Sequence, residues 1–130
     1  MACFIVPGTE AIVASIVEKA VASKEDENGS AKKAVAEGKI TWKQKLSWLT
    51  AMLWGGAALL ALEHIWHGEV VLYPPFLTAM SNAADTSAML HEMSTVGVAM
   101  AVTVTVIWIA MVLISDHVPA IKKKLAGGVA

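Results

Sequence analysis

The chain of 130 residues lacks arginine, has a single cysteine and carries few charges. All ten basic residues are lysines, charged residues make up 16% of the sequence, and the formal net charge is −1. Without arginine the bidentate grip on phosphate is missing, and without a basic excess we expect no nucleic-acid surface. Cys3 has no second cysteine with which to form an intrachain disulfide or a thiolate metal cluster.

Hydrophobic residues make up 56% of the chain, which is more than a soluble domain of this size can bury. A domain of this length leaves roughly a third of its surface in water. We therefore expect a single-domain membrane protein rather than a water-soluble enzyme. The sequence also has no nucleophile paired with a base, no phosphate loop and no acid–base pair in a definable pocket, so we expect no enzymatic activity.

Two long apolar runs predict transmembrane helices. Residues 46–62 carry no charge, and a helix that continues to residue 66 would be about 31 Å long at 1.5 Å per residue. The hydrocarbon core of a bilayer is roughly 30 Å thick. Residues 94–115 form a second uncharged run. We therefore expect an all-α membrane protein in which residues 42–121 form a transmembrane helical hairpin, with spans at about 46–66 and 94–115.

The lysines predict the orientation of this hairpin. Seven precede residue 46, three follow residue 121, and none lies between. By the positive-inside rule, both termini would be cytoplasmic and the loop 67–93 would lie outside the cytoplasmic membrane. We expect the aromatic and basic side chains at the span ends to anchor the hairpin in the bilayer interfaces, with the basic tail 122–130 on anionic headgroups: Trp42, Trp66, Lys122, Lys123 and Lys124.

Residues 1–22 are expected to form an N-terminal amphipathic helix on the inner membrane surface or against a partner. Pro7 and Gly8 would break the start, and Thr9 would be the N-cap. A third span is the open alternative, in which Glu10 and Glu18 would each cost a few kcal/mol if they faced lipid. Residues 23–41 are expected to be a solvated polar linker. The aliphatic side of the expected helix holds Ile12, Val13, Ile16, Val17, Ala20 and Val21.

Candidate chemistry is concentrated in residues 63–93, which hold three of the four histidines. His67 and His91 are expected at similar heights on neighbouring helices, with His64 one turn below and Glu92 beside them. Imidazoles and a carboxylate at one level could bind a divalent transition metal, and a histidine pair could hold haem. Two other interpretations stay open, namely interfacial hydrogen bonding to headgroups and loop backbone, and a response to external acidity.

Small residues in the two spans predict close helix packing. They are Gly55 and Gly56 in the first span, and Gly97 with Ala101 in the second. Packing within the hairpin is one explanation. Association with a second copy or with a larger membrane protein is the other. We therefore expect a non-enzymatic membrane protein that acts by helix association, as an oligomer or an accessory subunit. The alternative is a metal- or haem-binding membrane protein.

Three stretches of the sequence also resemble a known group of proteins. The segment LEHIWHGEVVLYPPFLTA at residues 62–79, the residues LHEM at 90–93 and the start MACFIVPGTEAIV look like small two-span membrane proteins of anaerobic bacteria. The resemblance covers most of the chain except the linker. It implies a bacterial origin and a membrane location, and nothing about catalysis.

Overall fold

A computed structural model describes residues 2–128, without the side chains at 121–123, 125 and 126. Within that part of the chain the regular structure is helical, apart from one isolated bridge between Val70 and Leu77. The elements in chain order are α1 (Ile5–Glu27), α2 (Ser30–Ala36), α3 (Trp42–Trp66), η1 (Thr78–Ser81), α4 (Ala83–Glu92), η2 (Met93–Gly97) and α5 (Val98–Gly128).

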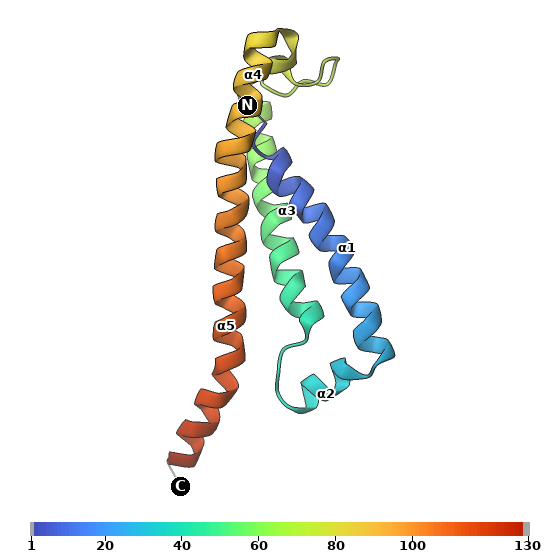
Figure 1. Ribbon diagram of the computed structural model, residues 1–130, viewed down its shortest axis with the longest axis vertical. Helices are drawn as coiled ribbons and strands as arrows, with labels where there is room; N and C mark the ends of the chain where they lie inside the picture. The colour runs from blue at the N-terminus through green and yellow to red at the C-terminus, as the bar shows by residue number, and fades with distance from the viewer. Residues whose placement is uncertain (1, 129–130) are drawn as a thin grey trace.

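Three long helices run side by side (Figure 1). The helix α3 lies between α1 and α5 in the view, and both neighbours run in the direction opposite to it. The N-terminus therefore lies at the end of the molecule where α3 ends and α4 begins, and the C-terminus lies at the far end of α5 (Figure 1).

Two of the helices are long and apolar enough to cross a membrane. One is α3, and the other is the continuous helix of α4, η2 and α5, taken over Ala83–Ala120. They contain the two runs that the sequence predicts as spans. Only 22% and 17% of the residues in their most apolar windows are buried within the chain, so most residues in these windows are at least partly exposed.

In the loop between α3 and α4, the sequence predicts a helix stop at Gly68 and a cap of the second helix by Asn82 or Asp85. Gly68 adopts a φ of +72° directly after the last turn of α3, which confirms the predicted stop. Asn82 caps α4 by accepting a hydrogen bond from the Asp85 amide at 2.8 Å, as expected for an asparagine N-cap.

The predicted start of the first helix is wrong. The helix α1 begins at Ile5, so Pro7 and Gly8 lie inside it, and the Thr9 hydroxyl donates to the Ile5 carbonyl at 2.8 Å instead of capping. Proline is tolerated here because the amides of the first helical turn have no partner within the helix in any case. At its other end α1 reaches Glu27, well into the expected linker, and α2 occupies part of the rest.

One cluster of the core lies along the contact of α1 with α3, and another joins Ala2 to Ala79 of η1 and Met89 of α4. Ala11 and Ala14 of α1 pack against Leu49 and Leu53 of α3, and Leu53 is fully buried. Small side chains on α1 let the two helix axes come close, as at helix contacts in membrane proteins. The aliphatic side of α1 that the sequence identifies faces away from this contact, because Ile12, Val13, Ile16 and Val17 are all exposed.

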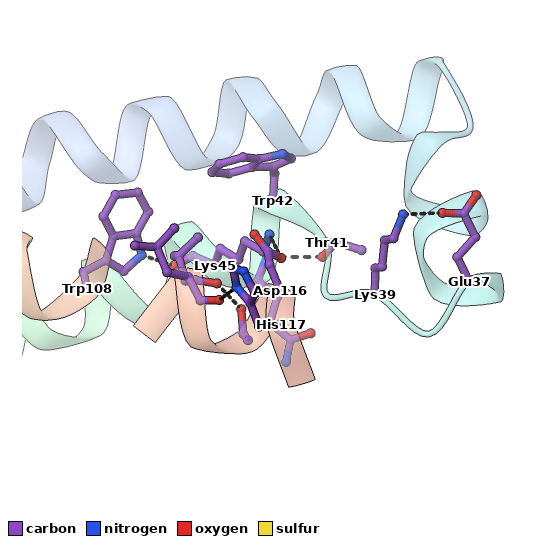
Figure 2. Close-up of polar contacts among 12 residues, drawn as sticks. Glu37, Lys39, Thr41, Trp42, Lys45, Trp108, Asp116 and His117 are labelled. Atoms are coloured by element: carbon purple, nitrogen blue, oxygen red, sulfur yellow. Dashed lines mark hydrogen bonds and ion pairs between the residues drawn. The ribbon is translucent and has the colours of Figure 1, made fainter. Parts of the chain in front are cut away.

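Polar contacts fasten the helices at the end where α3 begins (Figure 2). The indole Nε1 of Trp108 donates to the Lys45 carbonyl at 2.6 Å. Beside this bond the Lys45 ammonium lies between the Asp116 carboxylate and the Trp42 ring, 4.7 Å from the ring centroid. From α1, the Glu25 carboxylate accepts hydrogen bonds from the amides of Trp42 and Lys43 at 2.9 and 3.1 Å.

Candidate functional site

The buried His64 is the only candidate ligand that the described residues enclose. It lies near the end of α3, and its side chain is 6% exposed. The ring Nδ1 lies 2.6 Å from the Leu60 carbonyl. Because a carbonyl only accepts hydrogen bonds, Nδ1 carries a proton, and Nε2 is left to face the space between α1 and the loop.

Nε2 of His64 lies close to the thiol of Cys3 and the carboxylate of Glu69. It lies 3.4 Å from Cys3 Sγ and 3.6 Å from Glu69 Oε2. The Phe4 ring packs edge-on against the imidazole with 5.4 Å between ring centroids. With the ring proton on Nδ1, Nε2 can accept a hydrogen bond from the Cys3 thiol. We call Cys3, Phe4, His64 and Glu69 the His64 cluster.

The turn after α3 brings Glu69 back to His64. The positive φ of Gly68 reverses the chain, and the Glu69 amide then donates to the His64 carbonyl at 2.9 Å. A residue with a Cβ would be strained at that angle, so glycine is required for this return. The Thr78 amide in turn donates to the Glu69 carbonyl at 3.0 Å, which ties the loop to the same point.

Of the other predicted ligands, His67 and His91 are exposed to solvent. His67 is exposed and lies 4.0 Å from Glu63 Oε1, one turn back along α3, as their spacing predicts. His91 is exposed on α4, and its carbonyl accepts hydrogen bonds from the Ser94 and Thr95 hydroxyls. Glu92 is partly buried at the end of α4.

No metal site forms from these side chains in the part of the chain that the structure describes. No group of three or more His, Cys, Asp or Glu side chains there could hold a metal ion. Sequence reasoning also missed Cys3 as a partner of His64. The two residues are 61 positions apart, so the pairing depends on α1 lying along α3, and no local spacing indicates that.

A groove of about 630 Å³ runs between α3 and α5, and its lining is mostly apolar. Gly56 lies in its wall, and a Cβ at that position would meet no atom within 4 Å. Gly55 is equally open but does not line the groove. The groove is formed chiefly by Met52, Gly56 and Leu59 on one side and by Ala99, Met100 and Thr103 on the other.

The predicted packing residues of the second span face inward. A Cβ on Gly97 would lie 2.9 Å from Val6 Cγ2 and 3.1 Å from the Cys3 carbonyl oxygen, so Gly97 packs against the start of α1. Ala101 is buried as well. Both residues therefore serve packing within the chain. Gly55 and Gly56 are the two predicted packing residues at which a Cβ would meet no other atom within 4 Å.

The predicted interfacial anchors lie near the two ends of the helices. Trp42 is exposed at the start of α3, and Trp66 is exposed at its end. Lys124 is exposed near the end of α5. The side chains of Lys122 and Lys123 lie outside the described part of the chain. Trp42 and Trp66 are the first and last residues of α3, so the full length of the helix separates them.

Comparison of the chain with protein-family models, with curated proteins and with solved structures finds no match.

Proposed function

We propose that this protein is a small, non-enzymatic integral membrane protein that works by helix association. The helices α3 and α5 would lie in the cytoplasmic membrane, and the groove between them would receive a transmembrane helix. That helix would come from a second copy of the chain or from a larger membrane complex, with this chain as its accessory subunit. The resemblance to small bacterial membrane proteins agrees with this location.

The proposal depends on the empty space above Gly56 in the lining of the groove. Helix pairs in a bilayer gain little from the hydrophobic effect, so they associate where small residues let their backbones approach. At Gly56 the groove is apolar, and the space above Cα is empty. An arriving helix could therefore approach the α3 backbone without displacing a side chain of this chain.

Two leucine substitutions test the groove. Gly56→Leu fills the groove, whereas Gly55→Leu makes the same change beside it, where the space is equally open. We expect Gly56→Leu to reduce association several-fold and Gly55→Leu to leave it unchanged. Self-association is measured by energy transfer between labelled copies in lipid vesicles, and association with other proteins by native pull-down from the membrane. If neither variant changes either readout, the groove is not the association surface.

Binding of a divalent metal or haem by His64, His67, His91 and Glu92 stays the alternative prediction. Purified protein with a Soret band or stoichiometric metal would support it. His67 is exposed at the end of α3. Under this alternative, His67→Ala would lower the amount of bound metal or haem. Helix association through the groove does not depend on the His67 side chain.

A further inference from the structure

The helix α1 turns small residues and two of its polar side chains toward the other helices and exposes several aliphatic side chains. Its small residues Ala11 and Ala14 lie buried against α3. On the opposite side Val13 is 55% and Ile16 is 63% exposed. A helix on the surface of a soluble protein has the reverse arrangement, with its large aliphatic side chains turned to the core.

Two polar side chains along the inner side of α1, those of Glu10 and Ser15, have partners on other helices. The Glu10 carboxylate and the Thr105 hydroxyl of α5 lie 2.6 Å apart. One and a half turns further along α1, the Ser15 hydroxyl accepts a hydrogen bond from the Trp54 indole of α3 at 3.1 Å. At its two ends, α1 is fastened by the contact of Cys3 with His64 and by the Glu25 cap on α3.

A helix in the hydrocarbon core of a bilayer must pair its polar groups with other protein groups and turn aliphatic side chains toward lipid. We propose that α1 crosses the bilayer as a third span beside α3 and α5, with its outward aliphatic face against lipid acyl chains. This inference rests on the membrane location in the proposed function. It assigns lipid as the contact of the outward face of α1, a surface that is separate from the groove between α3 and α5.

The length of α1 fits a span, although α1 is not one of the two helices that are apolar enough to cross a membrane on composition alone. Residues 5–22 extend about 27 Å as a helix, close to the roughly 30 Å of the hydrocarbon core. Glu18 lines a small hollow with Thr41 and Lys43 at the start of α3, so Glu18 and Lys19 would lie at the interface. Glu10 alone lies deep, level with the middle of the second predicted span, and it is bonded to Thr105 rather than turned to lipid.

Three spans place the two termini on opposite sides of the membrane. Because α1 runs parallel to α5 (Figure 1), Cys3 would lie outside together with the loop 67–93. The lysine-rich segment between α1 and α3 would stay inside with the C-terminal lysines. No lysine precedes Lys19, so this topology satisfies the positive-inside rule. It replaces the expected cytoplasmic N-terminus with an external one.

Spin labels on single cysteines in the full-length protein distinguish lipid, water and protein around α1. In a Cys3→Ala background, Ile16→Cys places the label on the aliphatic face of α1. The matched control, Val35→Cys, places it on an equally exposed aliphatic position of α2. The protein is reconstituted in vesicles of phosphatidylcholine and phosphatidylglycerol. Collision rates are measured with molecular oxygen, which enters lipid, and with a water-soluble nickel chelate.

We expect the label at position 16 to collide with oxygen and to collide several-fold less with the nickel chelate than the label at position 35. Equal nickel collision at both positions would place α1 in water and overturn the proposal. Low collision with both reagents at position 16 would mean that protein covers this face, and it would overturn the lipid contact. The Gly56→Leu comparison does not depend on this face, so failure of the two proposals can be told apart.

A second measurement tests the external N-terminus with native Cys3 in place. A short epitope joined to the N-terminus should be removed by protease added to intact spheroplasts, as should an epitope inserted at Ser81. An epitope inserted at Ser30 should survive until the membrane is opened. Protection of the N-terminal epitope together with the expected pattern at the other two sites would contradict the third span while leaving α3 and α5 in the membrane.

Discussion

The ammonium nitrogen of Lys45 lies 2.5 Å from Asp116 Oδ1, and this ion pair joins the start of α3 to α5 across 71 positions of sequence. The two side chains differ in environment: that of Lys45 is 6% exposed and that of Asp116 is 45% exposed. The Trp42 ring covers the ammonium group on another side (Figure 2). The pair therefore holds a largely buried cation next to a carboxylate that still reaches solvent.

We predict that Asp116→Asn lowers the free energy of unfolding by roughly 1–3 kcal/mol, because it leaves the buried Lys45 ammonium without its counter-charge. Thermal and denaturant unfolding of the purified protein in detergent, followed by circular dichroism, measure the loss. In the double variant with Lys45→Met, the stranded charge is gone, and we expect part of the stability to return. Equal losses in the single and double variants would show that the charge pairing contributes nothing.

The exposed pair of Glu37 and Lys39 predicts a pH effect in the segment before α3. Lys39 donates to Glu37 Oε2 at 2.8 Å (Figure 2). This hydrogen bond, followed by the charge of Lys39, holds the pKa of the Glu37 carboxyl below its ordinary value. The contribution of the pair to stability is therefore present at neutral pH and is lost as the pH falls through the lowered pKa.

Titration of the Glu37 carboxyl by nuclear magnetic resonance measures this shift. We expect Lys39→Met to raise the pKa of Glu37 toward its ordinary value. Lys33→Met should raise it less, since Lys33 acts on Glu37 only through its charge and more weakly than Lys39 does. Because both partners are exposed, the global unfolding transition should change little with either substitution. An unchanged titration in Lys39→Met would rule out the ion pair in solution.

Local signals in the sequence predicted most of what is local in this fold. The two apolar runs lie in the two long helices, Gly68 ends α3, and Asn82 caps α4. The first helix was located only in part. Pro7 suggests a break because it cannot continue a helix from its interior, yet it lies within the first turn of α1, where its missing amide costs nothing.

Periodicity identified the aliphatic side of α1 but could not say what that side contacts. An apolar stripe on a helix is the same pattern whether it meets protein, a membrane surface or lipid chains. The structure shows which side of α1 packs on α3, because Ala11 and Ala14 of α1 are buried against Leu49 and Leu53. The contacts of Cys3 with His64 and of Glu10 with Thr105 are equally invisible to sequence reasoning, since they join residues 61 and 95 positions apart.

The Glu25 carboxylate gives a prediction about the start of α3. It accepts hydrogen bonds from the amides of Trp42 and Lys43, which have no partner within the helix, and its charge lies at the positive end of the helix dipole. We expect Glu25→Gln to cost about 1 kcal/mol of stability. Hydrogen exchange at the two amides should become faster. Glu27→Gln removes the same charge from the exposed end of α1 and should leave both amides protected. Unchanged exchange in Glu25→Gln would contradict the cap.

Two glycines should respond in opposite directions to the same substitution. At Gly97 a new methyl group would meet Val6 Cγ2 at 2.9 Å and the Cys3 carbonyl oxygen at 3.1 Å. The Val6 side chain can move, but the Cys3 backbone cannot move without shifting the start of α1. We therefore expect Gly97→Ala to destabilise the protein by roughly 1–3 kcal/mol through overpacking.

At Gly55 the same methyl group meets no atom within 4 Å. Glycine inside a helix is less favourable than alanine by about 1 kcal/mol, so Gly55→Ala should stabilise the protein by up to that amount. Unfolding of both variants in one detergent gives the comparison. Because helix propensity favours alanine at both sites, a loss confined to Gly97→Ala can come only from its neighbours. Stabilisation of both variants would mean that α1 does not pack against Gly97 in the folded protein.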